Sequence, residues 1–121
     1  MKSEMRASLA PLLERLRLYN QPQRLMILSC LCVKPCSVSE IEHATQIGQP
    51  ALSQQLGELR RAGMIASTRE AREVTYGFAT LQEKRRAEKI LSLQAQENEM
   101  AREPEFSSSH VGAQFASILL D

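Results

Sequence analysis

The sequence is poor in aromatic residues: Phe, Tyr and Trp make up 4% of its 121 residues, and Trp is absent. The core must therefore be built mainly from Leu, Ile, Val, Met and Ala, which favours packed helices over a β-sandwich. Five Gly and five Pro are too few for a low-complexity chain. The longest nearly apolar run, Leu25 to Val33, is far shorter than the ~20 residues of a membrane-spanning helix, so we expect no membrane partner.

Cysteine is also scarce, with three residues in the chain. Lys2, Glu4 and Arg6 interrupt the apolar residues near the N-terminus, so we expect no secretory signal. An odd number of cysteines without an export signal indicates reduced thiols rather than a disulfide framework. We therefore expect a cytoplasmic protein.

The formal net charge of +1 hides an asymmetry along the chain. Residues 1–90 contain 14 of the 15 basic residues and 9 of the 14 acidic ones, a balance of +5, whereas residues 91–121 carry −4. A basic body favours an anionic partner, although two ordinary solvated surfaces would give the same sums.

Hydrophobic periodicity predicts a mainly helical chain with one hairpin. Pro11 indicates that the first helix begins near residues 8–11, because proline is tolerated only in a first turn or at a kink. Ser37 and Glu40 have the spacing of a capping box, which predicts the start of a short helix. Further helices are expected over 23–33, from Gln49-Pro50 to about Ala62 with Gly63 as its cap, over 81–101 and within 107–121, and strands over 64–68 and 73–78 with a turn at 69–72.

The two short helices and the hairpin after them have the order of a winged helix-turn-helix: support helix, turn, recognition helix, wing. Leu52, Leu56 and Leu59 form one apolar face of the recognition helix. The fold class we expect is mainly α with a small β-hairpin, and the many leucines of the first helix predict a dimer. The opposite face of the recognition helix is polar but weakly charged, which suits contact with base edges, and it carries Pro50, Ser53, Gln54, Gly57, Glu58 and Arg61.

Two further features of this region favour DNA as the partner. Glycine inside a helix costs about 1 kcal/mol relative to alanine, so Gly57 indicates the close approach of either a DNA backbone or another helix. Four arginines are expected to contact phosphates, or otherwise only to solvate the surface: Arg60, Arg61, Arg69 and Arg72.

Three parts of the chain resemble the ArsR/SmtB family of bacterial repressors, over about residues 9–95. They are the stretch from Gln23 to Leu28, the block from Ile47 to Ile65, and the segment from Thr68 to Tyr76. The form Gly-Gln-Pro-x-Leu-Ser-Gln-Gln-Leu is most similar to the sulfide- and persulfide-responsive branch that includes BigR and SqrR. The resemblance implies a homodimer paired through its first and last helices, which binds a double-stranded operator and is released by an inducer. It also matches Ser53 and Gln55 to the polar pair of the family's recognition helix, and the expected DNA-binding set is Gln49, Pro50, Ser53, Gln54, Gln55, Arg60, Arg61, Arg69 and Arg72.

The inducer sites of the family do not carry over to this chain. Ser37 and Ser39 stand where arsenic-responsive members have thiolates, and His43 and His110 do not lie on the last long helix, where zinc-responsive members have ligands. The branch's dithiol pair is missing as well, because Ser29 occupies the first position and no cysteine follows Cys36. We expect no metal and no cofactor.

The three cysteines, Cys30, Cys32 and Cys36, are the remaining candidates for an inducer or redox site. Residues i and i+2 of a helix point apart, so Cys30 and Cys32 make a poor disulfide pair. The chain break at Pro35 can bring Cys32 and Cys36 together, and any redox response is expected to use that pair or to act between subunits. The alternative is that all three thiols serve as small apolar side chains.

These features predict a DNA-binding transcriptional repressor with residues 1–101 as the DNA-binding and dimerisation domain and residues 102–121 as a linker and short helix. It is released by an unidentified signal, such as a thiol-reactive compound or a soft metal. The alternative is a winged-helix protein-interaction module that does not bind DNA. An enzyme is not expected, because the chain has no Ser-His-Asp or Cys-His arrangement and no phosphate-cradling glycine loop.

Overall fold

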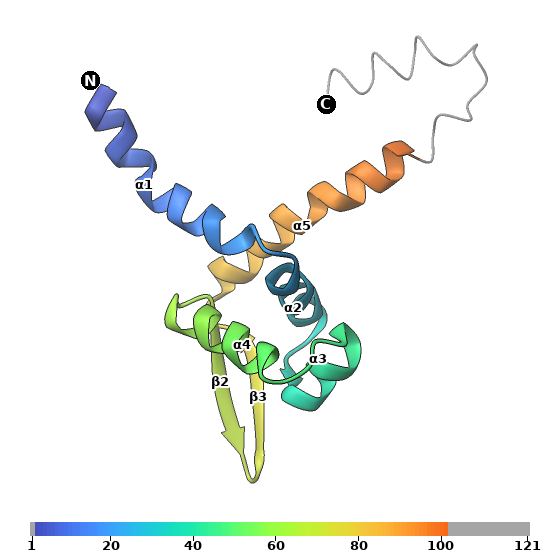
Figure 1. The fold of residues 1–121 in the computed structure, drawn as a ribbon. Helices are drawn as coiled ribbons and strands as arrows, with labels where there is room; N and C mark the ends of the chain where they lie inside the picture. The colour runs from blue at the N-terminus through green and yellow to red at the C-terminus, as the bar shows by residue number, and fades with distance from the viewer. Residues whose placement is uncertain (1, 102–121) are drawn as a thin grey trace, which may run out of the picture. The chain divides into compact units, whose positions relative to one another are not determined.

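The computed structural model describes residues 2–101, and their side chains from residue 3 to residue 94. Residues 1–91 form one compact unit, and residues 92–121 belong to a second. The expected helix within 107–121 lies outside the described residues. Helices and a small sheet alternate as α1 (Lys2–Tyr19), α2 (Pro22–Val33), β1 (Cys36–Ser37), α3 (Val38–Thr45), α4 (Ala51–Arg61), β2 (Ile65–Glu70), β3 (Glu73–Phe78) and α5 (Leu81–Ala101), as Figure 1 shows. The predicted class, mainly helical with a β-hairpin, is confirmed.

The start of the first helix was predicted wrongly. α1 begins at Lys2 and continues through Pro11, rather than starting near residues 8–11. A proline removes one backbone donor from a helix, and the residues on both sides of this one are mostly strong helix formers. The helix propensity summed over the 18 residues of α1 therefore outweighs the one backbone hydrogen bond that Pro11 removes.

The capping box at the start of α3 is confirmed. The Ser37 hydroxyl accepts a hydrogen bond from the amide of Glu40 at 3.2 Å, and the Glu40 carboxylate accepts one from the amide of Ser37 at 2.9 Å. The same carboxylate forms an ion pair with Lys34 at 2.8 Å. The Lys34 ammonium and the Ser37 backbone amide lower the pKa of Glu40 to about 2. These contacts fix the entry of α3 against the end of α2.

The end of α4 is closed by Gly63, as predicted. Gly63 has a positive φ of 77°, and its amide donates to the carbonyl of Arg60. The next amide, that of Met64, donates to the carbonyl of Leu59, and the two bonds together make a Schellman motif. Only glycine adopts this backbone conformation without strain, so Gly63 sets the point where the chain leaves the helix and enters the wing.

The wing is longer and its turn tighter than the sequence indicated. β2 and β3 pair antiparallel as far as Glu70 opposite Glu73, so Arg69 lies within a strand and only Ala71 and Arg72 form the turn. Ala71 has a positive φ of 55°, which allows a turn of two residues. The predicted four-residue turn at 69–72 was therefore wrong by two residues.

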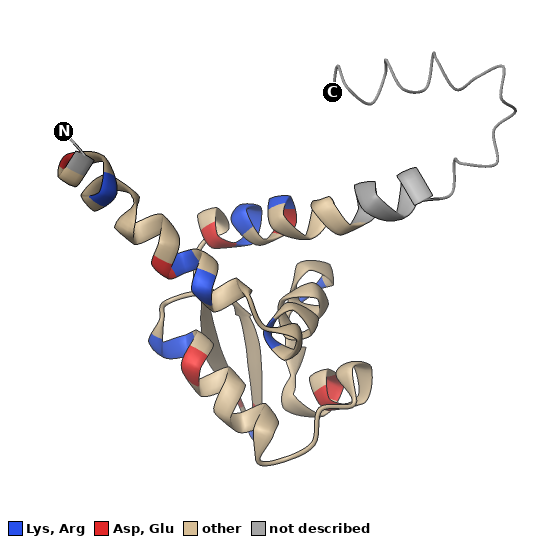
Figure 2. Cartoon of the chain, turned by 45° about the horizontal axis from the view of Figure 1, so that its top comes forward, with Lys and Arg blue, Asp and Glu red and all other residues tan. Residues whose placement is uncertain are grey.

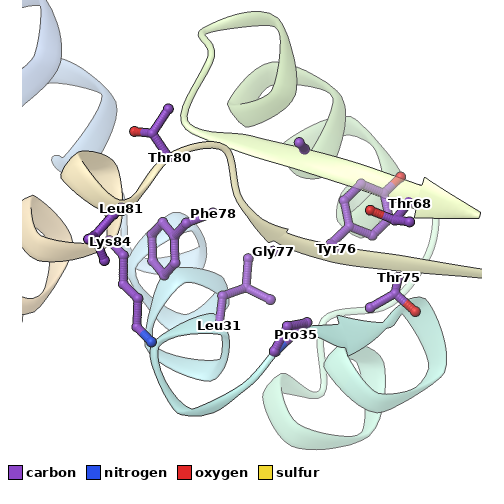
Figure 3. A pocket seen from close by; sticks show the side chains of 11 residues that line it. Leu31, Pro35, Thr68, Thr75, Tyr76, Gly77, Phe78, Thr80, Leu81 and Lys84 are labelled. Atoms are coloured by element: carbon purple, nitrogen blue, oxygen red, sulfur yellow. The ribbon is translucent and has the colours of Figure 1, made fainter.

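A third strand was not predicted. β1 contains only Cys36 and Ser37 and pairs with β3, which gives the sheet the order β1-β3-β2. Pro35, directly before β1, packs on β3: a Cβ on Gly77 would lie 3.7 Å from its ring. Figure 3 shows Pro35 beside Gly77. Both residues line an open hollow of about 430 Å³. This contact joins the end of α2 to the wing.

The core of the compact unit is aliphatic, as the composition required. The largest of its fully buried side chains come from α2, α3, α4, the turn after α4 and the start of β2, and they are Ile27, Leu28, Ile41, Leu52, Leu59, Met64 and Ile65. The buried carboxylate of Glu83 on α5 pairs with Arg86 at 2.7 Å and with Arg15 of α1 at 3.4 Å. Arg15 also donates to the carbonyl of Ala62, so α1, α5 and the end of α4 are tied together at one point.

Candidate nucleic-acid interface

α4 has one buried face and one exposed face. Leu52, Leu56 and Leu59 are at most 2% exposed, which confirms the predicted apolar face. Ser53 and Gln54 lie on the exposed side. Figure 2 shows that α4 is uncharged over most of its length and charged only toward its end, where Glu58, Arg60 and Arg61 lie. An exposed helix face that is polar but uncharged has the donors and acceptors needed to read base edges.

Gln49 stabilises the beginning of α4. Its side-chain oxygen accepts hydrogen bonds from the amide of Ser53 at 3.1 Å and from the Ser53 hydroxyl at 2.6 Å. Because Pro50 has no side-chain donor or acceptor, Gln49 takes the place of the usual N-cap residue. The Gln49 oxygen is used within the protein, and its amide NH₂ group and the oxygen of Ser53 remain for a partner.

Gln55 is placed differently from the expected DNA contact. It is half-buried and faces α2, where its oxygen accepts a hydrogen bond from Nε of Arg24 at 2.9 Å. Its nitrogen donates to the side chain of Gln23 at 3.3 Å. The structure thus uses Gln55 to hold α4 against α2, and leaves Ser53 and Gln54 as the exposed polar pair.

The surroundings of Gly57 bear on the two explanations given for it. In the described part of the chain, a Cβ on Gly57 would meet only the guanidinium of Arg61, at 3.3 Å. Packing within one chain therefore does not account for a glycine here. The close approach of a DNA backbone, or of a helix from another chain, stays a prediction.

The four arginines form two separate pairs. Arg60 and Arg61 lie in the last turn of α4, whereas Arg69 lies near the end of β2 and Arg72 lies in the turn at the tip of the wing. All four side chains are exposed. Figure 1 shows the wing projecting away from the helices, with its turn at the tip. Exposed arginines commonly contact DNA phosphates, so both pairs are candidates for such contacts.

The cysteines are arranged differently from the expectation. Sγ of Cys36 lies 3.9 Å from the carbonyl oxygen of Cys30, and both residues line one apolar pocket. Cys32 faces another side of α2: burial raises the pKa of its thiol, and the charges that act on it are those of Glu88 and Lys84 of α5. The structure thus places Cys30 and Cys36 at one pocket and Cys32 on another side of α2. That any redox response uses Cys32 with Cys36, or acts between subunits, stays a prediction.

The described part of the chain offers neither a metal site nor a membrane-spanning helix. Among the residues that the structure describes, no three His, Cys, Asp or Glu side chains are grouped so as to hold a metal ion. No helix in the described part is long and apolar enough to cross a bilayer.

Comparison with known proteins agrees with this geometry. Residues 21–67 match the family described as "Bacterial regulatory protein, arsR family". The Biofilm growth-associated repressor of Agrobacterium fabrum is 47% identical over 58 residues, which cover 48% of this chain and half the length of that relative. The Transcriptional activator HlyU of Vibrio cholerae is 32% identical over 96 residues, 79% of this chain and 89% of that protein.

A solved structure extends the likeness to the fold. The transcriptional repressor BigR from Xylella fastidiosa superposes with a TM-score of 0.71 and 27% identity, over 80% of this chain and 96% of that one. These similar proteins are named as regulators, in agreement with the expectation that the chain is not an enzyme. The HlyU likeness covers most of both chains, and the family match includes α2, α3 and α4. The chain belongs to the ArsR family of bacterial regulatory proteins, whose fold is the winged helix-turn-helix.

Proposed function

We propose that the protein is a DNA-binding transcriptional repressor of the cytoplasm that recognises its operator with α4 and the wing. The observation that carries the proposal is the exposed face of α4, which is polar and uncharged between a buried leucine face and a basic end. A helix of 11 residues fits the major groove with this face toward the bases. Ser53 and Gln54 then read base edges, and Gln can form a bidentate contact with adenine.

The arginine pairs supply the affinity that does not depend on sequence. Arg60 and Arg61 contact phosphates beside the groove that α4 enters, while Arg69 and Arg72 reach the backbone or the minor groove beyond it. Each such contact releases counterions from DNA, so binding weakens as salt rises.

The proposed repressor acts as a homodimer. α1 exposes a run of large apolar side chains, between 43% and 69% exposed, that a folded monomer would normally cover. They are Met5, Leu9, Leu12, Leu13 and Leu16. A two-fold dimer built on this face would present two copies of α4 to a palindromic operator.

One set of experiments can distinguish a repressor from an activator, and a DNA-binding protein from a module that binds only proteins. The relatives include one named as a repressor and one named as an activator. A winged-helix module that binds only proteins is the competing function, and it has no need of exposed arginines at the wing tip. Exposed Arg69 and Arg72 favour DNA over that alternative.

The test is a selection of duplexes from a random pool, followed by fluorescence anisotropy with the selected sequence. Gln54→Ala is expected to reduce discrimination against single base changes at one position by about 1–3 kcal/mol. Gln82→Ala, an exposed glutamine of α5, is the matched control and should leave discrimination unchanged. Recovery of no enriched duplex would contradict DNA recognition. A reporter gene behind the selected sequence then separates repression from activation.

A further inference from the structure

The apolar pocket beside the end of α2 contains two thiols. It has a volume of about 530 Å³, and its lining includes Cys30 and Val33 of α2, Cys36 of β1, and His43 and Ala44 of α3. Cys36 is 6% exposed, and Cys30 is more accessible at the pocket wall. Neither thiol is used by the DNA-binding surface described above.

The fold places both thiols at the same pocket, with Cys36 beside the backbone of Cys30. Sγ of Cys36 lies 3.2 Å from the carbonyl oxygen of Lys34 and 3.9 Å from that of Cys30. The chain reverses between them at Pro35, and β1 is fixed by its pairing with β3. A disulfide requires Cα atoms within about 7 Å, and a sulfur 3.9 Å from the backbone of the other cysteine is compatible with that limit.

We propose that Cys30 and Cys36 form a modification site at which an organic hydroperoxide produces an intramolecular disulfide. The sulfur of Cys30, the more accessible thiol, attacks the outer peroxide oxygen. The O–O bond breaks, the alcohol leaves with one proton, and Cys30 becomes a sulfenic acid. The sulfur of Cys36 then attacks that of Cys30, the S–S bond forms, and water leaves with the second proton. Two thiols and one hydroperoxide thus give one disulfide, one alcohol and one water.

The surroundings favour an apolar oxidant over a polar one. The exposed wall of the pocket is mostly apolar, although Lys34, Ser39, Glu40 and His43 also line it, so an alkyl or aryl hydroperoxide gains from burial there. Burial raises the pKa of both thiols, which makes their reaction with any oxidant slow. An apolar hydroperoxide offsets this slow reaction because it accumulates in the pocket beside the thiols.

The position of Cys36 links this site to both DNA-binding elements. It directly precedes Ser37, the N-cap of α3, and it pairs with Tyr76 of β3 in the wing. A bond to Cys30 draws β1 toward α2 and thereby shifts the support helix relative to the wing. This consequence rests on the proposed DNA-binding function, whereas formation of the disulfide does not.

The experiment treats the full chain with cumene hydroperoxide and maps its cysteines by mass spectrometry after alkylation. In the Cys32→Ser variant we expect one bridge between Cys30 and Cys36 and a mass lower by two hydrogens. Cys30→Ser, at a half-buried position, should abolish the bridge. In the wild-type chain, a bridge that includes Cys32, bridges only between chains, or three thiols still free would each overturn the proposal.

A second measurement addresses the DNA consequence separately. Oxidised Cys32→Ser protein is expected to bind the selected duplex at least about tenfold more weakly than the reduced protein, with recovery after dithiothreitol. Equal binding before and after formation of the mapped bridge would overturn the link between this site and DNA. If the reduced protein binds no duplex, the proposed function fails while the mapped disulfide still stands.

Discussion

Arg24 of α2 forms an ion pair with Glu58, the one carboxylate of the recognition helix α4. The same guanidinium donates to Gln55 at 2.9 Å and to the carbonyl of Leu18 at 3.4 Å. One buried cation therefore holds α1, α2 and α4 together and neutralises the negative charge nearest to the proposed DNA surface. The side chain of Arg24 is 11% exposed and that of Glu58 is 48% exposed. Water can therefore solvate the charge of Glu58 much better than that of Arg24 when the ion pair is lost.

Removal of Arg24 is expected to affect stability and DNA binding by separate routes. Arg24→Gln should reduce the free energy of unfolding by about 2–3 kcal/mol, because several charge-assisted hydrogen bonds are lost. Glu58→Gln should cost at most about 1 kcal/mol, since Glu58 is half exposed to solvent. Urea unfolding of both variants checks this.

The double variant distinguishes charge from packing. Arg24→Gln leaves Glu58 unpaired beside the DNA phosphates, so Arg24→Gln/Glu58→Gln should bind the selected duplex more tightly than Arg24→Gln alone. Identical affinities for these two variants would show that Arg24 acts only on the fold.

Replacement of Gly63 by alanine should destabilise the protein far more than replacement of Gly48. Gly63→Ala places a Cβ at a φ of 77° and should destabilise the protein by about 1–2 kcal/mol. Gly48 has neither a positive φ nor an atom within 4 Å of its Cβ position, so Gly48→Ala should be close to neutral. Thermal unfolding followed by circular dichroism compares the two, and equal losses would contradict the Schellman cap as the cause.

Gly57→Ala is expected to separate stability from function. Alanine should stabilise α4 by up to about 1 kcal/mol, because among the described residues only the flexible end of Arg61 lies near the new methyl group. The added methyl should nevertheless weaken binding to the selected duplex, by roughly 1–3 kcal/mol if the DNA backbone passes this close. Stronger folding together with unchanged DNA affinity would remove Gly57 from the interface.

The lowered pKa of Glu40 predicts a pH range over which the free energy of unfolding changes. Its folded pKa of about 2 lies below the ordinary value of 4.5, so its contribution is complete above about pH 4.5 and is lost as the pH falls toward 2. The difference in unfolding free energy between the wild type and Glu40→Gln should shrink over that window. Urea titrations at several pH values measure it, and a constant difference would contradict the ion pair and capping box as its source.

The sequence predicted the parts of the fold that depend on local chemistry. The capping box at Ser37, the glycine cap at residue 63 and the apolar face of α4 each follow from residues a few positions apart. By contrast, β1 has two residues, too few for alternation to reveal, and it exists only because β3 lies beside it. The start of α1 was predicted too late because one proline was given more weight than the helix formers around it.

Some positions in the candidate site also follow from nearby residues, whereas others depend on residues far away in the sequence. The exposed positions of Ser53 and Gln54 follow from the period of the helix. The inward placement of Gln55 depends on Arg24, 31 residues away, and was not visible from the recognition helix alone. The position of Cys30 and Cys36 at one pocket likewise depends on the path of the chain at Pro35.

The salt dependence of operator binding tests the central claim most directly. Anisotropy titrations of the selected duplex over a range of salt concentrations give the slope of log affinity against log salt for the wild type, Arg69→Ala, Arg72→Ala and the control Arg6→Ala. Because each lost phosphate contact removes about one from the slope, both wing variants should have shallower slopes while the control matches the wild type. Wing variants with the wild-type slope would contradict a wing that contacts DNA.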